Sequence, residues 1–152
     1  MSLKYNRITV FGSFIRFLLL KNFYKKIILG AGGISIKGYL KTEQSYFDIE
    51  HKWKYFKPNK LEAIIAEHVF EHLDHPELAA RHCYDALKAG GELTIAVPAG
   101  PQAKDKEYGH KRVFTEDSLS DMLKTAGFVE LQRLIIDSRI RRENSLIIKA
   151  IK

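Results

Sequence analysis

The chain has 152 residues, of which 45% are hydrophobic and 11% aromatic, so we expect one packed domain over residues 1–152 rather than a disordered chain. A single cysteine excludes an internal disulfide and any zinc site built from several thiolates, and it is compatible with the cytoplasmic location that we expect. The charge is uneven, with twelve Lys and Arg against three Asp and Glu in residues 1–60 and thirteen against fifteen in residues 61–152. The basic half predicts a solvated lysine-rich surface, with nucleic acid, anionic lipid or an acidic substrate as alternative partners.

An amphipathic helix is expected first, within residues 1–25. The apolar stretch Ile8–Leu20 is too short to cross a bilayer and contains Arg16, and no small-residue cleavage site follows it, so we expect neither a membrane span nor a secretory signal. Helical spacing gathers four apolar side chains on one face: Phe11, Phe14, Ile15 and Leu18. We expect this face to pack on a sheet, and peripheral contact with a membrane surface is the alternative.

Short apolar runs next predict the first strands of a sheet. Lys26–Leu29 is typical of a buried strand and enters the glycine-rich loop Gly30–Gly33. Two short extended pieces are expected at Tyr39–Thr42 and Tyr46–Ile49, followed by a strand at Ala63–Ala66. The connections between these pieces are too short for the usual crossover helix, so we expect reduced helices on the N-terminal side of the sheet.

Two helices with clear start and stop signals are expected in the second half. The first spans Pro76–Lys88, opens with proline and stops at the glycine pair that begins with Gly90. Its apolar spacing places Cys83 in the core as a small side chain. The second helix is capped by Thr115 and stops at Gly127.

The later strands complete the predicted sheet. Glu92–Val97 predicts its central strand, and Val129–Ile136 and Ser145–Ile151 predict an antiparallel hairpin. This order of elements predicts an α/β fold: a Rossmann-like, mostly parallel sheet with a C-terminal antiparallel hairpin. Ligands of such sheets bind beyond the carboxyl ends of the strands, where Glu67 and His68 follow a predicted strand.

Five short motifs follow one another along the chain. They are Gly30-Ala31-Gly32-Gly33, Gly38-Tyr39-Leu40-Lys41-Thr42-Glu43, Asp48-Ile49, Glu67-His68-Val69-Phe70-Glu71-His72-Leu73 and Gly109-His110. With the Leu87–Gly91 segment, they resemble the class I S-adenosylmethionine (SAM)-dependent methyltransferases. The resemblance is closest to a branch of small methyltransferases often associated with glycan or polysaccharide biosynthesis, and it covers roughly Lys26 to the C-terminus.

The resemblance implies SAM as the cofactor. A glycine loop lets the backbone approach a ligand that has no phosphate, whereas the NAD fingerprint needs a third glycine where Ser35 stands, and the sequence has no Walker phosphate loop. By the resemblance, Glu43 would accept hydrogen bonds from the ribose hydroxyls, while Asp48 and Ile49 would hold the adenine. The implied cofactor-binding residues are Gly30, Ala31, Gly32, Glu43, Asp48, Ile49 and Glu67.

Two histidines are the candidate catalytic residues. His68 lies where cofactor and acceptor would meet, and His110 lies in the loop before the last helix, beside Lys111 and Arg112, which suit an anionic acceptor. If the motif around His68 is helical, His72 shares a face with it, a spacing that also suits a metal. The metalloprotease pattern His-Glu-x-x-His is absent, and we assign no metal.

The predicted function is SAM-dependent methyl transfer to a small-molecule or sugar-type acceptor, at oxygen, with the acceptor taken from the family association alone. Ile28 stands where most of these methyltransferases have Asp or Glu. It favours an alternative, a degenerate binding protein or partner subunit without activity. A third hypothesis is a nucleic-acid-binding module that uses the basic residues 1–60 and loses affinity steeply with salt. No Asn-Pro-Pro-Tyr-like motif occurs, so we disfavour base methylation and a nucleic-acid partner.

A homodimer is the expected assembly. With few helices on the side formed by residues 30–60, apolar strand residues there need another surface to cover them, and a two-fold contact is the commonest solution. The residues expected to be exposed are Ile34, Ile36, Tyr39, Leu40, Tyr46 and Phe47.

Overall fold

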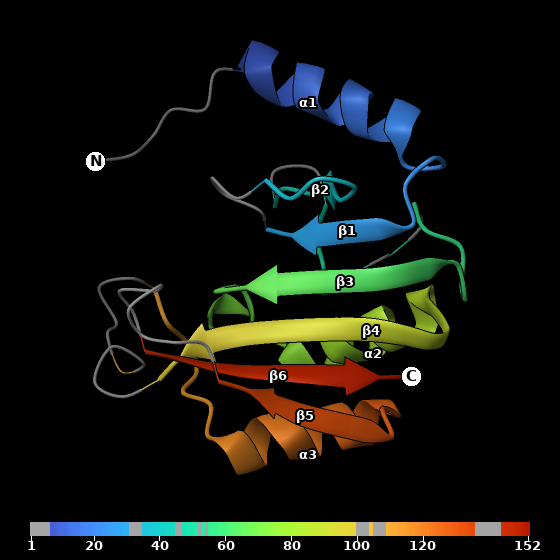
Figure 1. The fold of residues 1–152 in the computed structure, drawn as a ribbon. Coiled ribbons are helices and arrows are strands. Elements are labelled where there is room, and N and C mark those ends of the chain that lie inside the picture. Colours follow the sequence, from blue (N-terminus) through green and yellow to red (C-terminus); the bar gives the residue numbers. More distant parts are fainter. Residues whose placement is uncertain are drawn as a thin grey trace.

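The computed structural model describes residues 7–152 apart from 31–34, 45–46, 52, 54, 100–103, 105–108 and 136–143. In this part of the chain, six strands form one mixed sheet in the order β2-β1-β3-β4-β6-β5 (Figure 1). The strands are β1 (Lys26–Leu29), β2 (Leu40–Lys41), β3 (Leu61–Glu67), β4 (Leu87–Pro98), β5 (Glu130–Leu134) and β6 (Ser145–Ile151). Strands β2, β1, β3 and β4 are parallel, and β6 is antiparallel to β4 and β5. The predicted fold class is confirmed.

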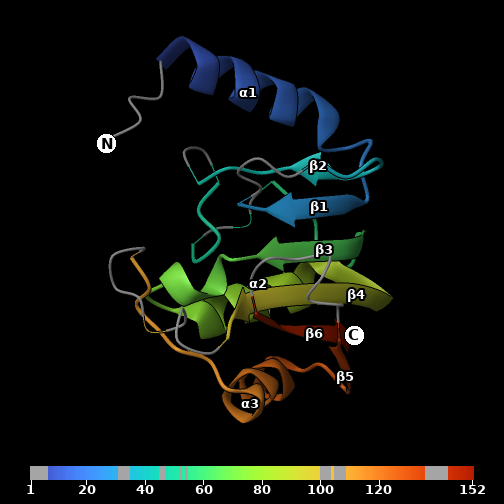
Figure 2. The same ribbon diagram turned by 60° about the vertical axis from the view of Figure 1, so that its left-hand side comes forward.

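Three α-helices and one 3-10 turn accompany the sheet in the described residues. They are α1 (Arg7–Leu20), η1 (Phe70–His72), α2 (Pro76–Ala86) and α3 (Glu116–Ala126). Helices α2 and α3 pack on one face of the sheet, whereas α1 lies along the edge formed by β2 (Figures 1 and 2). None of these helices is long and apolar enough to cross a membrane.

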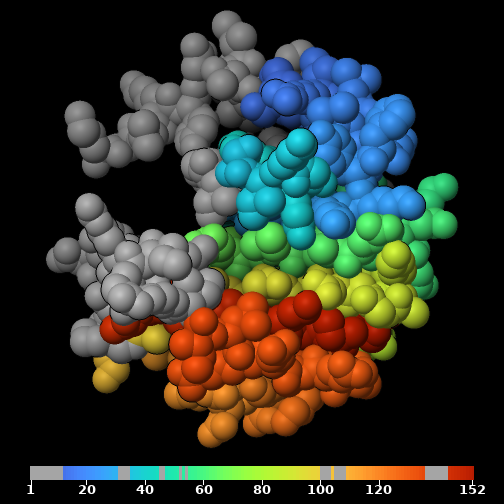
Figure 3. All heavy atoms as spheres, in the orientation of Figure 1, coloured from blue at the N-terminus to red at the C-terminus, as the bar shows by residue number. Residues whose placement is uncertain are grey.

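The opposite face of the sheet has no described helix over it, and Figure 3 shows strands β3 to β6 at the surface of this face. Its buried positions hold small or branched side chains, among them Ala63, Ala96 and Ile147. This face also carries charged residues: Lys149 Nζ of β6 lies 2.6 Å from Glu92 Oε1 of β4. The reduction in helices therefore leaves one face of the sheet polar enough to meet solvent.

Local signals set the limits of α3 as predicted. Thr115 Oγ1 accepts a hydrogen bond from Ser118 N at 3.2 Å, and Ser118 Oγ accepts one from Thr115 N at 2.9 Å, which forms a reciprocal cap. Gly127 ends the helix with a φ of +115°, a conformation that favours glycine. The predicted cap and stop are confirmed.

Two predicted elements differ from the structure. Helix α2 does not extend over Pro76–Lys88, because Leu87 is already extended and pairs with Leu61 of β3. The predicted strand Tyr46–Ile49 is wrong, since the described residues 47–49 form loop and bend. Packing of buried side chains on the sheet overrides the local pattern in both places.

An aromatic cluster holds the N-terminal half together where crossover helices are missing. The rings lie with centroids 5.0 to 6.3 Å apart, mostly edge to face. The cluster joins α1 to the segment before β3 and consists of Phe17, Phe47, Trp53, Tyr55 and Phe56. Its two most buried members are Phe17, which is 1% exposed, and Phe47, which is 2% exposed.

The cluster corrects two expectations about the N-terminal half. The predicted apolar face of the helix included Ile15, which is 42% exposed, whereas the fully buried residue is Phe17. Leu40 and Phe47, which were expected to be exposed, are buried beneath α1 and the aromatic rings. Ile36 is 38% exposed, as expected, and Ile34 and Tyr46 lie outside the described residues. Among the described residues, the apolar surface on this side of the sheet is therefore smaller than the sequence indicates.

Candidate functional site

The carboxyl ends of β1, β3 and β4 lie at the same edge of the sheet. Leu29 pairs with Ala66, and Ala66 pairs with Ile95, so the three strands end side by side. The chain leaves β1 for β2 on one side and then crosses to β3 on the other, which makes a topological switch point. In open α/β sheets, ligands bind in the crevice outside such a point.

A pocket of about 240 Å³ lies at this switch point. Four of the predicted site residues line it: Gly30, Asp48, Ile49 and His68. It is completed by Gln44, Phe47, Glu50, Val69, His72, Leu73, Asp74 and Lys111. The structure therefore brings residues from three separate motifs together.

The other predicted residues lie elsewhere. Glu43 lines a larger cavity of about 460 Å³ between α1 and the β2 edge, and Glu67 is the half-buried last residue of β3. Ala31 and Gly32 lie outside the described residues. We place the candidate site at the smaller pocket, because it adjoins the carboxyl ends of the central strands.

Gly30 is the point where the backbone comes close to its neighbours. Its φ is +55°, and a Cβ at this position would lie 2.9 Å from Val69 Cγ2. Only glycine adopts this conformation without strain and leaves room for the turn that follows β3. The sequence predicted close backbone approach at this loop, and at Gly30 the close neighbour is the Val69 side chain.

Asp48 organises the loop on the opposite wall of the pocket. Its Oδ1 accepts a hydrogen bond from Glu50 N at 2.9 Å, and its Oδ2 lies 2.8 Å from His51 Nδ1. The Ile49 carbonyl accepts a hydrogen bond from Trp53 Nε1, which ties the loop to the aromatic cluster. Asp48 is exposed, and each carboxylate oxygen keeps a second lone pair for a ligand.

His68 is held in an unusual backbone conformation at the end of β3. Its φ is +52°, and its N donates a hydrogen bond to Ala96 O at 2.9 Å. The motif does not form the regular helix on which a shared face of His68 and His72 would depend: His68 is left-handed, and only the single turn η1 forms after it. The ring lies between Ser145 Oγ, 3.3 Å from Nε2, and Glu71 Oε1, 3.3 Å from Nδ1.

Glu71 was not among the predicted site residues, yet it lies beside the pocket, close to the two lining histidines His68 and His72. It is 1% exposed, and neither of its carboxylate oxygens has a hydrogen-bond donor among the described residues. His72 Nε2 lies 3.7 Å from Oε1, and the rings of His72 and His110 lie 5.0 Å apart. In the sequence, Glu71 stands between His68 and His72. The apolar periodicity of this segment does not indicate that the Glu71 side chain is buried.

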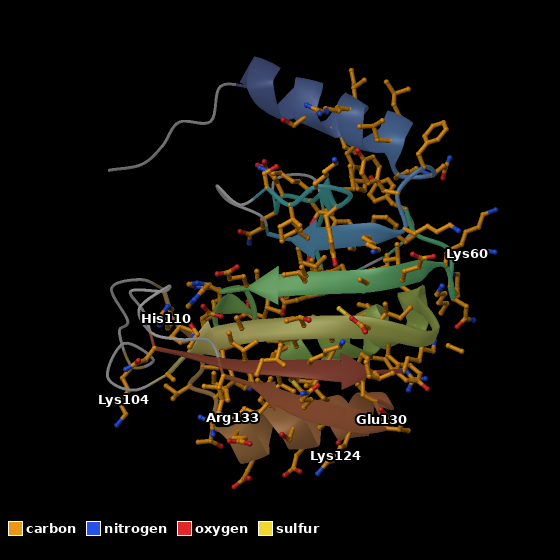
Figure 4. All side chains as sticks on the ribbon, in the orientation of Figure 1. Lys60, Lys104, His110, Lys124, Glu130 and Arg133 are labelled. Atoms are coloured by element: carbon orange, nitrogen blue, oxygen red, sulfur yellow. The ribbon has the colours of Figure 1, made fainter. Side chains whose placement is uncertain are left out.

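The two residues that follow His110 are hydrogen-bonded to η1. The Glu71 carbonyl accepts hydrogen bonds from Lys111 N at 2.8 Å and Arg112 N at 3.1 Å. Lys111 Nζ hydrogen-bonds Asp74 Oδ2 at 2.7 Å and thereby lowers the pKa of Asp74, and Arg112 Nη2 donates to the Asp74 carbonyl. These two cations, predicted to hold an anionic acceptor, are thus used in the loop contact, although Lys111 still lines the pocket. Figure 4 shows His110 at the end of the sheet toward which β1, β3 and β4 run.

Comparisons with known proteins agree with this architecture. A family model described as a methyltransferase domain matches residues 31–132. No curated protein matches the sequence. Several solved structures have the same fold, all at low sequence identity.

Three of these structures illustrate the likeness. A SAM-dependent methyltransferase of Thermotoga maritima is 17% identical with a TM-score of 0.59, over 95% of this chain and 97% of that one. Phosphoethanolamine N-methyltransferase 2 of Haemonchus contortus, in complex with SAM, is 12% identical with a TM-score of 0.62, over 99% of this chain but 58% of that one. A Haloferax volcanii methyltransferase in complex with the Trm112 methyltransferase activator is 13% identical with a TM-score of 0.59, over 92% and 78% of the two chains.

Proposed function

The chain belongs to the methyltransferase domain family, and we propose that it transfers the methyl group of its cofactor, SAM, to an oxygen of a small-molecule or sugar-type acceptor. The observation that carries the proposal is the pocket at the switch point, which joins Gly30 and the Asp48–Ile49 loop to His68. The choice of oxygen and of a sugar rests on the resemblance of the motifs.

The residues present fit SAM. The backbone at Gly30 has no room for a Cβ, as is expected where a chain passes close to its neighbours and a ligand. Ile49 offers an apolar side chain and Asp48 a carboxylate in the same loop. Pockets that enclose a drug-sized ligand measure about 300–1,000 Å³. Because this pocket is smaller, we expect the cofactor to extend along the sheet edge toward Glu43.

When bound, SAM supplies an electrophilic methyl group on a sulfonium. The protein then has to hold an acceptor oxygen in line with that group and to receive its proton. His68 is oriented for the second task by contacts at both ring nitrogens. A proton taken at Nε2 makes an imidazolium whose other side faces the Glu71 carboxylate, 3.3 Å away, and this negative charge stabilises it.

His110 is the second candidate for proton transfer. Its ring contacts that of His72, which lines the pocket, and the two residues after it donate backbone hydrogen bonds to the Glu71 carbonyl. With an identified acceptor, His68→Ala or His110→Ala is expected to lower kcat by about 10² to 10⁴, the usual contribution of a general base. A parental rate for either variant would remove that histidine from catalysis.

A partner subunit without activity is the second candidate function. Ile28 stands where most of these methyltransferases have Asp or Glu, and it is fully buried. Because its side chain has no polar atom, it makes no polar contact with a ligand. One structural neighbour is a methyltransferase in complex with an activator, so a chain of this fold can assemble with a second protein.

Calorimetry with SAM and with S-adenosylhomocysteine separates the candidates. Binding of either ligand by the whole chain is expected if it is the enzyme. The partner subunit and the nucleic-acid module both predict no heat at millimolar ligand. Titration with single-stranded and duplex nucleic acid at two salt concentrations identifies the module, whose affinity falls steeply with salt.

We further propose a cytoplasmic homodimer. The cytoplasmic location is supported by one free cysteine, Cys83, which is fully buried and whose thiol pKa is raised by that burial. The dimer is supported by exposed apolar side chains on and after α1, namely Ile15, Leu19 and Phe23. Peripheral contact of this helix with a membrane is the alternative use of the same side chains.

A further inference from the structure

We propose that Glu71, His72 and His110 bind a divalent transition-metal cation beside the pocket. One ligand atom from each of the three residues can be chosen so that all lie within 4.8 Å of one another. The proposal adds a cation to the site and does not depend on methyl transfer, because metal binding is measured without turnover.

The first support is the state of the Glu71 carboxylate. The side chain is 2% exposed, and its two oxygens have no hydrogen-bond donor among the described residues. A buried carboxylate without donors is strongly destabilising unless a positive charge compensates it. The nearest polar atoms are ring nitrogens, with His68 Nδ1 at 3.3 Å and His72 Nε2 at 3.7 Å from Oε1.

The second support is the orientation of the His72 ring. Its Nδ1 lies 3.1 Å from the carbonyl oxygen of Gly109, which can only accept a hydrogen bond. Nδ1 therefore carries a proton, and Nε2 is the nitrogen that faces Glu71 Oε1. A histidine held by a carbonyl at one nitrogen, with the other nitrogen free to ligate, is the usual arrangement around a protein-bound metal.

The distances suit a cation between these atoms. Zinc–nitrogen and zinc–oxygen bonds of about 2.0–2.1 Å at tetrahedral angles put ligand atoms about 3.4 Å apart. The observed 3.7 Å between His72 Nε2 and Glu71 Oε1 needs only a small shift to reach this value. The same two atoms without a cation or an added proton would repel each other.

The third ligand comes from a distant part of the chain. The His110 ring packs edge-on against His72, with an interplanar angle of 63°. Its loop is fixed by backbone hydrogen bonds from Lys111 and Arg112 to the Glu71 carbonyl, so the three ligands are brought together before any metal binds. In the sequence, the possible metal spacing was that of His68 and His72. His110 lies 38 residues after His72, so its approach to this pair depends on the fold.

The ligand set indicates the kind of cation. Two imidazoles and one carboxylate suit Zn²⁺, Fe²⁺, Co²⁺ or Mn²⁺, whereas Mg²⁺ and Ca²⁺ prefer oxygen ligands alone. Three protein ligands leave a coordination position open, as in catalytic zinc sites. Since His72 lines the pocket together with His68, an acceptor oxygen is the group expected at that position.

Cobalt titration of the tag-free whole chain tests the proposal. After treatment with a chelator and dialysis, CoCl2 is added and the visible absorption of the protein is followed; ZnCl2 is then titrated by calorimetry. Saturation at one cation per chain is expected for the parent protein. Loss of a second-shell partner weakens metal binding by about 10- to 100-fold, so Glu71→Gln and His110→Ala should weaken it at least ~100-fold.

Matched controls separate this site from adventitious binding. His51→Ala and His75→Ala remove exposed histidines outside the cluster and should bind the cation as the parent does. His110→Ala is the safer test variant because, unlike Glu71, His110 is only half-buried, and circular dichroism checks that each variant folds.

Three outcomes would overturn the proposal: no saturation at millimolar cobalt in folded protein, equal affinity of His110→Ala and His75→Ala, or equal loss in all four variants. Calorimetry with SAM on the same chelator-treated protein keeps the two proposals distinct. SAM binding without metal binding refutes only the metal site, and metal binding without SAM binding refutes only the cofactor assignment.

Discussion

The two halves of this molecule are held together in different ways. From β3 onward, long strand ladders and two helices with defined ends form a regular core, as in the seven paired positions between β4 and β6. Before β3, two short strands are packed beneath α1 by aromatic rings, and the described residues include no crossover helix. The candidate site lies between the halves, so its geometry depends on both.

Each half supplies different residues to the candidate site. Gly30 and the Asp48–Ile49 loop belong to the N-terminal half, whereas His68, Glu71 and His110 belong to the C-terminal half. We therefore expect damage to the first half to reach ligand binding even when the second half stays folded.

The largest effect is expected in the aromatic cluster. Phe47→Ala removes a ring that is 2% exposed and lines the pocket, and it should destabilise the fold by about 3–5 kcal/mol, measured by urea unfolding. Leu119→Ala, in α3, is the matched change in the other half and should destabilise by about 2–5 kcal/mol.

SAM affinity distinguishes these two variants. At a temperature where both are folded, Phe47→Ala should lose SAM binding, because it removes packing beneath the Asp48–Ile49 loop, whereas Leu119→Ala should keep it. Equal SAM affinity in the two variants would show that the halves are not separate in function.

Regular elements of the second half were predictable, and the packing of the first half was not. Thr115 and Gly127 mark the ends of α3 in the sequence, because a side-chain cap and a left-handed glycine are local features. Phe47 was expected to be exposed in a strand, since no local pattern shows that rings from α1 and from the segment before β3 close over it.

The site was predictable to a similar extent. Its place beyond the strand ends, and four of its lining residues, follow from motif order. The burial of Glu71 and its approach to His72 and His110 did not follow, because they depend on a turn that starts at a left-handed His68 and on a loop that returns from far along the chain.

A pair of glycines gives the next largest effect. Gly30 and Gly90 both have positive φ, +55° and +71°, so alanine at either should destabilise the fold by about 1–2 kcal/mol through backbone strain. Only at Gly30 does a Cβ meet a neighbour, with Val69 Cγ2 at 2.9 Å, while nothing lies within 4 Å of one at Gly90. SAM binding should therefore be lost in Gly30→Ala and unchanged in Gly90→Ala, as calorimetry would show. Similar affinities would remove Gly30 from the cofactor site.

Glu43 tests how far the cofactor extends along the sheet edge. If its carboxylate accepts hydrogen bonds from the ribose hydroxyls, Glu43→Ala should weaken SAM binding by about one to two decades, because a charged hydrogen bond contributes about 1.5–3 kcal/mol. Glu130→Ala is the control, since this exposed residue lies at the end of the sheet opposite to His110 (Figure 4). An unchanged affinity in Glu43→Ala would confine the cofactor to the pocket at the switch point.

Self-association is expected to show the smallest effect, because the aromatic cluster already buries Leu40 and Phe47. Among the described residues of the N-terminal half, Ile36 is 38% exposed. An exposed apolar stripe on α1 holds Ile15 at 42% and Leu19 at 67%, and Phe23, at 82%, lies just after the helix. Burial of a few hundred Å² of apolar surface contributes several kcal/mol at about 25 cal/mol/Å² before association costs, which suits a weak dimer.

Light scattering at about 100 μM protein should therefore report a mass approaching twice 17.5 kDa. Leu19→Lys should restore the monomer, while Val129→Lys, at an equally exposed residue of the C-terminal half, should not. A monomer for the parent chain at that concentration would contradict the dimer, and binding of the same stripe to anionic vesicles would assign it to a membrane surface instead.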